Sequence, residues 1–117
     1  QLANSDIITY HTYAPLESHK EMVDTLSRYS RPMVCTEYMA RTEGSTFQTI
    51  LPMLKKAGVG AINWGFVSNT IFSWATITHP CETPEPELWF HDILRKDGTP
   101  YSSDETDLIK RLTSSRQ

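Results

Sequence analysis

The stretch PMVCTEY, residues 32–38, is the segment that decides the fold. It is too short for a helix and is apolar on both faces, which is typical of a strand buried inside a parallel sheet. Alternation of its side chains would put Met33, Cys35 and Glu37 on one face. The predicted strand therefore ends in a carboxylate.

A strand and a helix precede this run. Residues 6–13 (DIITYHTY) are rich in β-branched and aromatic residues and predict a strand, on which His11 and Tyr13 share a face. Residues 17–29 carry apolar side chains at spacings of three and four, which indicates an amphipathic helix capped near Ser18.

A helix and a third strand follow. Ser45 fits an N-cap, and the helical stripe after it ends before Gly58. Pro52 inside that stripe predicts a kink or a restart of the helix. Residues 59–66 (VGAINWGF) predict a strand that carries Trp64 near its end. This alternation of strands and helices indicates an α/β fold with a parallel sheet.

The remainder of the chain begins with an aperiodic stretch, residues 66–102, and connections of that length are usually functional. Within it, Trp89 lies in an apolar run and is expected to pack in the interior. Ser102 and Glu105 predict a capping box for a last helix that runs to about Thr113. The apolar positions of that helix are Leu108, Ile109 and Leu112.

Composition excludes some classes of partner. The chain has 117 residues and a formal net charge of -3, with acidic and basic residues interspersed. It lacks the Lys/Arg stripe that a nucleic-acid partner would require. No apolar run approaches the roughly 20 residues that span a bilayer, so we expect no membrane segment.

No cofactor or metal is expected. The histidines outside the strand ends lack metal-ligand spacing; they are His19, His79 and His91. The sequence leaves open a disulfide between Cys35 and Cys81, although one buried thiol and one loop thiol are favoured.

The three predicted strands all end in residues suited to sugar recognition. These are His11 and Tyr13 on the first strand, Glu37 on the second and Trp64 on the third. Ligands of parallel α/β folds bind beyond the carboxyl ends of the strands, so the four side chains are expected to converge.

Four stretches carry a resemblance to a known family: YHTYAP, RPMVCTEYMAR, GAINWGFVS and PEPELWFHDILRKDGTPY. The chain resembles the cellulase-like, family-five type of clan A glycoside hydrolases, including bacterial endoglucanases and endoxylanases. The resemblance implies that residues 1–117 are the C-terminal part of a catalytic domain, strands 6 to 8 of a (β/α)8 TIM barrel. It also implies that the face shared by Met33, Cys35 and Glu37 points towards the barrel axis.

The resemblance assigns roles residue by residue. Glu37 would be the nucleophile, Tyr13 would hydrogen-bond its carboxylate, and His11 would line the same pocket. Trp64 would form the floor, and Trp74, in a polar loop, would be a further substrate contact. The acid/base would lie upstream of Gln1, so we expect the isolated chain to be inactive.

The leading hypothesis is therefore a glycosidase that hydrolyses a β-linked polysaccharide or oligosaccharide with retention. A non-catalytic sugar-binding or structural barrel fragment is the alternative. Arg41 and Glu43, just beyond the expected nucleophile, could contact substrate, although an interpretation as solvated loop charges is favoured. The sequence does not fix the oligomeric state or the compartment, although a secreted or periplasmic location is favoured over the cytoplasm.

Overall fold

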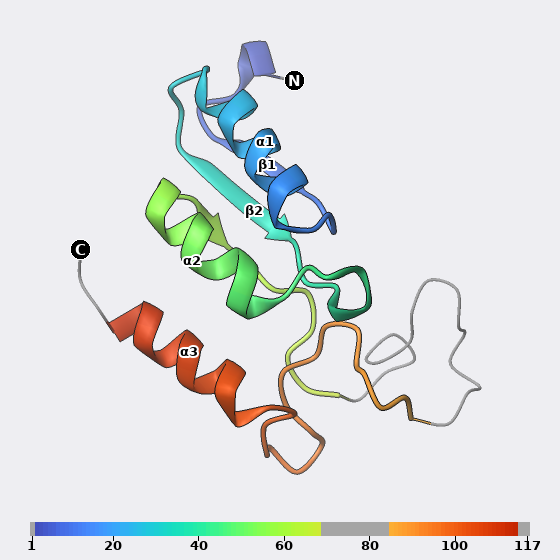
Figure 1. The fold of residues 1–117 in the computed structure, drawn as a ribbon. Coiled ribbons are helices and arrows are strands. Elements are labelled where there is room, and N and C mark those ends of the chain that lie inside the picture. The colour runs from blue at the N-terminus through green and yellow to red at the C-terminus, as the bar shows by residue number, and fades with distance from the viewer. Residues whose placement is uncertain (1, 69–84, 115–117) are drawn as a thin grey trace.

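The computed structural model describes residues 2–68 and 85–114, which form a small α/β fold (Figure 1). In chain order, the elements are the 3-10 helix η1 (Leu2–Asn4), β1 (Ile8–His11), α1 (Leu16–Ser27), β2 (Met33–Glu37), the 3-10 helix η2 (Arg41–Glu43), α2 (Phe47–Ala57), β3 (Gly60–Ala61) and α3 (Ser103–Ser114).

The three strands form one parallel sheet in the order β1-β2-β3. The prediction of a parallel sheet is confirmed, but two strands are shorter than predicted. β1 occupies only residues 8–11 of the predicted 6–13, and β3 only residues 60–61 of the predicted 59–66. One more backbone bond, from Ile62 N to Cys35 O at 2.8 Å, continues the pairing, after which the chain departs towards residues 91–94.

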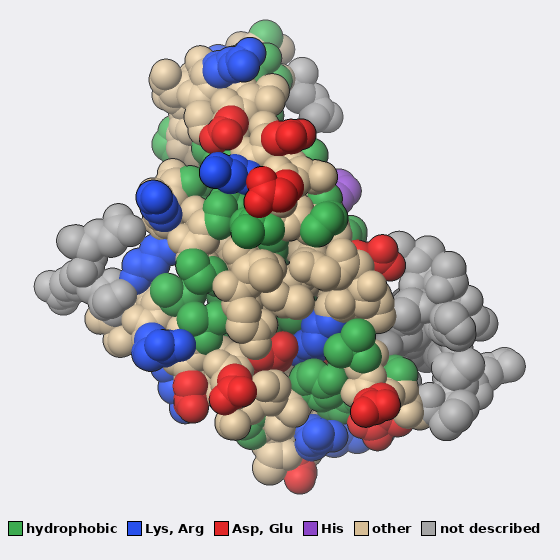
Figure 2. All heavy atoms as spheres, in the orientation of Figure 1, with side chains coloured by type: hydrophobic (Ala, Val, Ile, Leu, Met, Phe, Trp, Pro, Cys, Tyr) green, Lys and Arg blue, Asp and Glu red, His purple; other side chains and the backbone are tan. Residues whose placement is uncertain are grey.

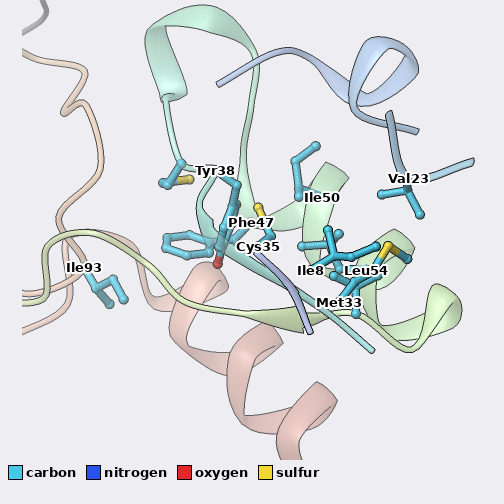
Figure 3. Close-up of a cluster of buried hydrophobic side chains, with 11 residues drawn as sticks. Ile8, Val23, Met33, Cys35, Tyr38, Phe47, Ile50, Leu54 and Ile93 are labelled. Atoms are coloured by element: carbon cyan, nitrogen blue, oxygen red, sulfur yellow. The ribbon is translucent and has the colours of Figure 1, made fainter. Parts of the chain in front are cut away.

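Helices α1 and α2 cover one face of this sheet (Figure 1). The core between the sheet and these helices contains Cys35, which is fully buried, together with side chains from β1, β2, α1 and α2. Other members of this cluster, drawn in Figure 3, are Ile8, Val23, Met33, Phe47, Ile50 and Leu54. Met33 and Cys35 therefore face the helices, and the expectation that their face points towards a barrel axis is wrong.

The starts of α1 and α2 differ from prediction. α1 begins after Pro15, whose fixed φ suits a helix start, rather than near Ser18. α2 is capped by Thr46 and Thr49 in a reciprocal capping box. The predicted cap, Ser45, is buried and donates to Tyr38 O at 2.5 Å.

Pro52 does not interrupt α2. The helix runs continuously to Ala57 and ends at Gly58, whose φ of 70° is the left-handed conformation of a helix C-cap. Pro52 is exposed, so water can reach the carbonyl that its ring leaves without a partner.

The C-terminal helix α3 lies beside α2 (Figure 1). Leu108 and Ile109 are half-buried and pack against the core. Cys35 is a free thiol, whereas Cys81 lies outside the described residues. In the part of the chain that is described, no helix is both long and apolar enough to span a bilayer. Figure 2 shows acidic and basic side chains interspersed over one face.

A buried histidine joins α1 to β1. His19 is fully buried, and its Nε2 lies 2.9 Å from the hydroxyl of Tyr10, with the two rings at 86°. Burial lowers the pKa of His19, because the imidazolium form would lose its hydration. The imidazole is therefore held neutral in the folded state.

This burial makes stability depend on pH. Because the folded-state pKa of His19 is lower than the unfolded value of about 6.5, its contribution is fully present above about pH 6.5 and is lost as the pH falls below it. Replacing His19 with Gln should reduce the loss of unfolding free energy between about pH 7.5 and 5, measured by urea denaturation. His11→Gln, an exposed site, is the control. Equal pH dependence of the wild type and His19→Gln would contradict this account.

Candidate active site

An irregularity in the pairing of β1 with β2 determines the direction of the Glu37 side chain. β1 and β2 pair residue by residue from Ile8 to Tyr10, and the register then shifts so that His11 pairs with Glu37 instead of Thr36. The hydroxyl of Thr36 donates to Tyr10 O at 3.1 Å, and Thr12 N donates to Glu37 O at 3.0 Å. Thr36 is therefore an extra residue in β2. Such a residue changes the direction in which the next side chain points. Glu37 is thereby separated from the core-facing set that ends at Cys35.

The carboxylate of Glu37 accepts a hydrogen bond from the hydroxyl of Tyr13. The prediction that these two side chains meet is confirmed, although the alternation used to derive it fails at the irregularity. Both side chains are half-buried. Burial first, and then the hydrogen bond to Glu37, raises the pKa of Tyr13 above its ordinary value. At neutral pH the phenol therefore remains protonated and able to donate.

The remaining predicted residues lie as follows. His11 is exposed at the last position of β1, in register with Glu37. Trp64 lies beyond the end of β3 and is 56% exposed, so its ring is not packed beneath the helices. Within the described residues it makes no aromatic contact with Tyr13. Trp74 lies outside the described residues.

Phe90, from the aperiodic stretch, lies against this site, and the sequence did not predict this contact. The ring of Phe90 packs on that of Tyr13, with centroids 5.7 Å apart and planes tilted by 38°. The backbone of Phe90 accepts a hydrogen bond from Arg41 N at 2.9 Å. The sequence signal that pointed to this stretch was the length of the aperiodic segment, residues 66–102.

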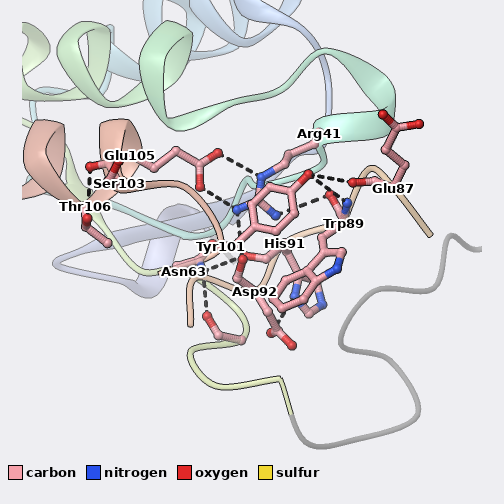
Figure 4. A network of polar contacts seen from close by, with 11 residues as sticks. Arg41, Asn63, Glu87, Trp89, His91, Asp92, Tyr101, Ser103, Glu105 and Thr106 are labelled. Carbon is pink, nitrogen blue, oxygen red and sulfur yellow. Dashed lines mark hydrogen bonds and ion pairs between the residues drawn. The ribbon is translucent and has the colours of Figure 1, made fainter. Parts of the chain in front are cut away.

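Arg41 is buried, and the interpretation of it as a solvated charge is wrong (Figure 4). Its Nε and Nη2 donate to the two carboxylate oxygens of Glu105 at 2.8 and 2.6 Å. Its Nη1 and Nη2 also donate to Trp89 O at 3.2 Å and Asp92 O at 2.8 Å. Glu43, by contrast, is exposed as predicted.

Aromatic rings complete the surroundings of this guanidinium. Its central carbon lies 4.4 Å from the ring centroid of Tyr101, which stacks on Trp89 at 4.7 Å. Trp89 is buried, as predicted. The side chain of Glu105 is committed to Arg41, so the expected capping box with Ser102 is wrong. The buried carboxylate of Glu105 needs a counter-charge, and the guanidinium of Arg41 provides it.

A second polar group lies next to Phe90. His91 and Asp92 are buried, with Nδ1 and Oδ1 3.1 Å apart. Asn63 donates from Nδ2 to the carbonyls of Gly65 and His91. Gly65 has a φ of 97°, and any β-carbon there would collide with the His91–Asp92 pair. This close approach fixes the chain just after Trp64.

Among residues 2–68 and 85–114, no group of three or more His, Cys, Asp or Glu side chains could hold a metal ion. The chemistry that this geometry supports is that of an oriented carboxylate. Glu37 has one hydroxyl donor, Tyr13, and lies at the carboxyl end of a parallel strand. An oriented carboxylate can act as a nucleophile or as a general base.

The buried pair can be tested by comparing single and double variants. Arg41→Met should lower the free energy of unfolding by about 3–5 kcal/mol, because it leaves the Glu105 carboxylate buried without a counter-charge. The double variant Arg41→Met/Glu105→Leu should be more stable than Arg41→Met, since it removes that carboxylate. Chemical denaturation of the wild type, Arg41→Met, Glu105→Leu and the double variant measures the coupling. Additive losses in the double variant would contradict the buried pair.

Comparisons of the chain with protein-family models, with curated proteins and with solved structures found no match. The contacts of Glu37 and Tyr13 at the ends of β2 and β1 are therefore the main structural support for a function.

Proposed function

We propose that this chain carries the nucleophile of a retaining glycoside hydrolase. The observation that supports the proposal is the hydrogen bond from the Tyr13 hydroxyl to the Glu37 carboxylate, formed where two neighbouring parallel strands end. Retaining glycosidases need an ionised carboxylate that attacks the anomeric carbon, and a second carboxyl group that protonates the leaving oxygen. Glu37 is suited to the first of these tasks.

Tyr13 serves the nucleophile in two ways. A hydrogen bond from a neutral hydroxyl to a carboxylate favours the ionised form, which is the reactive one. The bond also restricts the rotation of the carboxylate, so that its free oxygen keeps one direction for attack. The raised pKa of Tyr13 means that the phenol keeps its proton throughout the neutral range.

The substrate in this proposal is a β-linked polysaccharide or oligosaccharide. The exposed ring of His11 at the strand end would donate to or accept from sugar hydroxyls. The exposed indole of Trp64 offers a flat apolar surface to the face of a pyranose ring. Trp74 remains a proposed contact.

The proposed architecture is the part of a (β/α)8 barrel that contains its last three strand-helix units. Three parallel strands in chain order, with α1 and α2 on one face, are compatible with it. Among the described residues, β1 and β3 each pair on one side only. Large apolar side chains stay exposed near the end of β3; they are Ile62, Trp64 and Phe66. Further strands would cover such surfaces.

The second carboxylate is the missing partner in this mechanism. Among the described residues, no other carboxylate contacts Tyr13 or Glu37, and the buried Asp92 contacts His91 through Oδ1. We place the acid/base in another strand of the barrel, upstream of Gln1. A site with one carboxylate among the described residues also fits the alternative, a sugar-binding or structural unit without catalysis.

The proposal is tested in the complete reading frame that contains these residues. Glu37→Gly should lower turnover of aryl β-glycosides by roughly 10⁴-fold, as loss of one member of a catalytic set does. Added azide, which fits the space left by the carboxylate, should restore turnover and yield a glycosyl azide of inverted configuration. Glu43→Gly, in the exposed loop nearby, is the matched control and should behave as wild type.

The isolated 117-residue chain should show no turnover above that of its Glu37→Ala variant, because attack without protonation of the leaving group is ineffective. Retained activity of Glu37→Gly in the complete protein would contradict the assignment of the nucleophile. Sugar binding by a complete wild-type protein that turns over no glycoside would favour the non-catalytic alternative.

A further inference from the structure

The packing of Phe90 gives it a role distinct from that of a core residue. Phe90 is only 7% exposed, yet it is not a member of the hydrophobic cluster between the sheet and the helices. Its ring instead contacts the ring of Tyr13 and the buried imidazole of His91, at 5.7 and 5.2 Å between centroids. Phe90 therefore packs against the residue that holds Glu37.

We propose that Phe90 is a positioning residue for Glu37, acting through Tyr13, and that the buried Arg41–Glu105 pair fixes Phe90 in place. The inference rests on the proposed function, because it concerns how the nucleophile is oriented. It adds a path of contacts from α3, distant in sequence, to the carboxylate at the end of β2.

The first step of this path is the hold on the backbone around Phe90. Arg41 donates to three carbonyls of one short stretch: from its backbone N to Phe90, and from its guanidinium to Trp89 and Asp92. Glu105 accepts from Nε and Nη2 of the guanidinium with its two carboxylate oxygens. The stretch from Trp89 to Asp92 is therefore bound on both sides of Phe90.

The second step is the contact between the two rings. A phenol can swing about its side-chain torsions, and the ring of Phe90 removes part of that freedom by occupying one side of Tyr13. The Tyr13 hydroxyl then stays directed at Glu37. A misplacement of about 1 Å can cost roughly 10²-fold in rate, so a ring that limits this motion affects chemistry without touching substrate.

A smaller side chain at position 90 should weaken this control in a specific way. Loss of the hydrogen bond from Tyr13 disfavours the ionised carboxylate, so the acidic limb of the pH profile of kcat/KM should move to higher pH. Since Phe90 does not touch substrate in this arrangement, kcat should change and KM should not.

The experiment compares two identical substitutions in the complete protein, Phe90→Leu and Phe47→Leu. Phe47 is a buried ring in the core that contacts Tyr38 rather than Tyr13. Phe90→Leu should lower kcat by about tenfold, the value of one charge-assisted hydrogen bond, with KM within about twofold and the acidic limb shifted upward. Phe47→Leu should lower Tm and leave the pH profile in place.

A second variant keeps the test decisive if Phe90→Leu fails to fold. Arg41→Met/Glu105→Leu removes the hold on residues 89–92 without leaving a buried charge, and it should show the same shift of the acidic limb. A wild-type pH profile in that double variant, or in a folded Phe90→Leu protein, would overturn the positioning role.

Failure of this inference can be told apart from failure of the proposed function. If Glu37→Gly is inactive and is rescued by azide while Phe90→Leu behaves like Phe47→Leu, only the positioning role is wrong. If Glu37→Gly retains activity, the assignment of Glu37 as the nucleophile is wrong, and the positioning role of Phe90 is then wrong as well.

Discussion

The buried guanidinium of Arg41 is the interaction on which the arrangement of this chain depends. It joins three parts that are far apart in sequence: the exit of β2, the stretch around Trp89 and Asp92, and α3 through Glu105. A buried charge is costly unless every donor has a partner, and here the carboxylate and the carbonyls supply them. Irregular backbone can thus lie against the end of the sheet without regular pairing of its own.

The candidate site owes its geometry to a second constraint, the shift of register between β1 and β2. Regular pairing would set Thr36 opposite His11, whereas the extra residue sets Glu37 there. Tyr13, two residues further along, then reaches the carboxylate. A bulge at the rim of a sheet is a common means of directing a side chain. The helices pack on one face of the sheet, whereas the site lies where β1 and β2 end.

The sequence indicated the elements that have strong local signals and missed those set by distant contacts. The α2 stripe and its end at Gly58 were predictable because they depend on neighbours along the chain. The cap at Thr46 was missed because Ser45 is bound to Tyr38, a tertiary contact. β3 was predicted too long, since the residues after Ala61 leave the sheet for the stretch around His91.

In the candidate site, too, features with a local sequence signal were predicted and contacts without such a signal were missed. The meeting of Tyr13 and Glu37 could be predicted from their positions at the ends of adjacent strands. The contact of Phe90 with Tyr13 could not, because no local pattern links residue 90 to residue 13. From the sequence, Arg41 was interpreted as a loop charge and Glu105 as part of a helix cap. Their ion pair could not be predicted, because the two residues are neighbours only in the folded chain.

The central claim is that Glu37 is a nucleophile, and covalent trapping tests it most directly. A 2-deoxy-2-fluoro glycosyl fluoride slows both steps of a retaining mechanism, and its fluoride leaves without protonation, so the glycosyl-enzyme accumulates. Peptide mass spectrometry of the complete protein should then find one glycosyl ester, on Glu37. An ester on another carboxylate, or turnover with inversion and no adduct, would contradict the account.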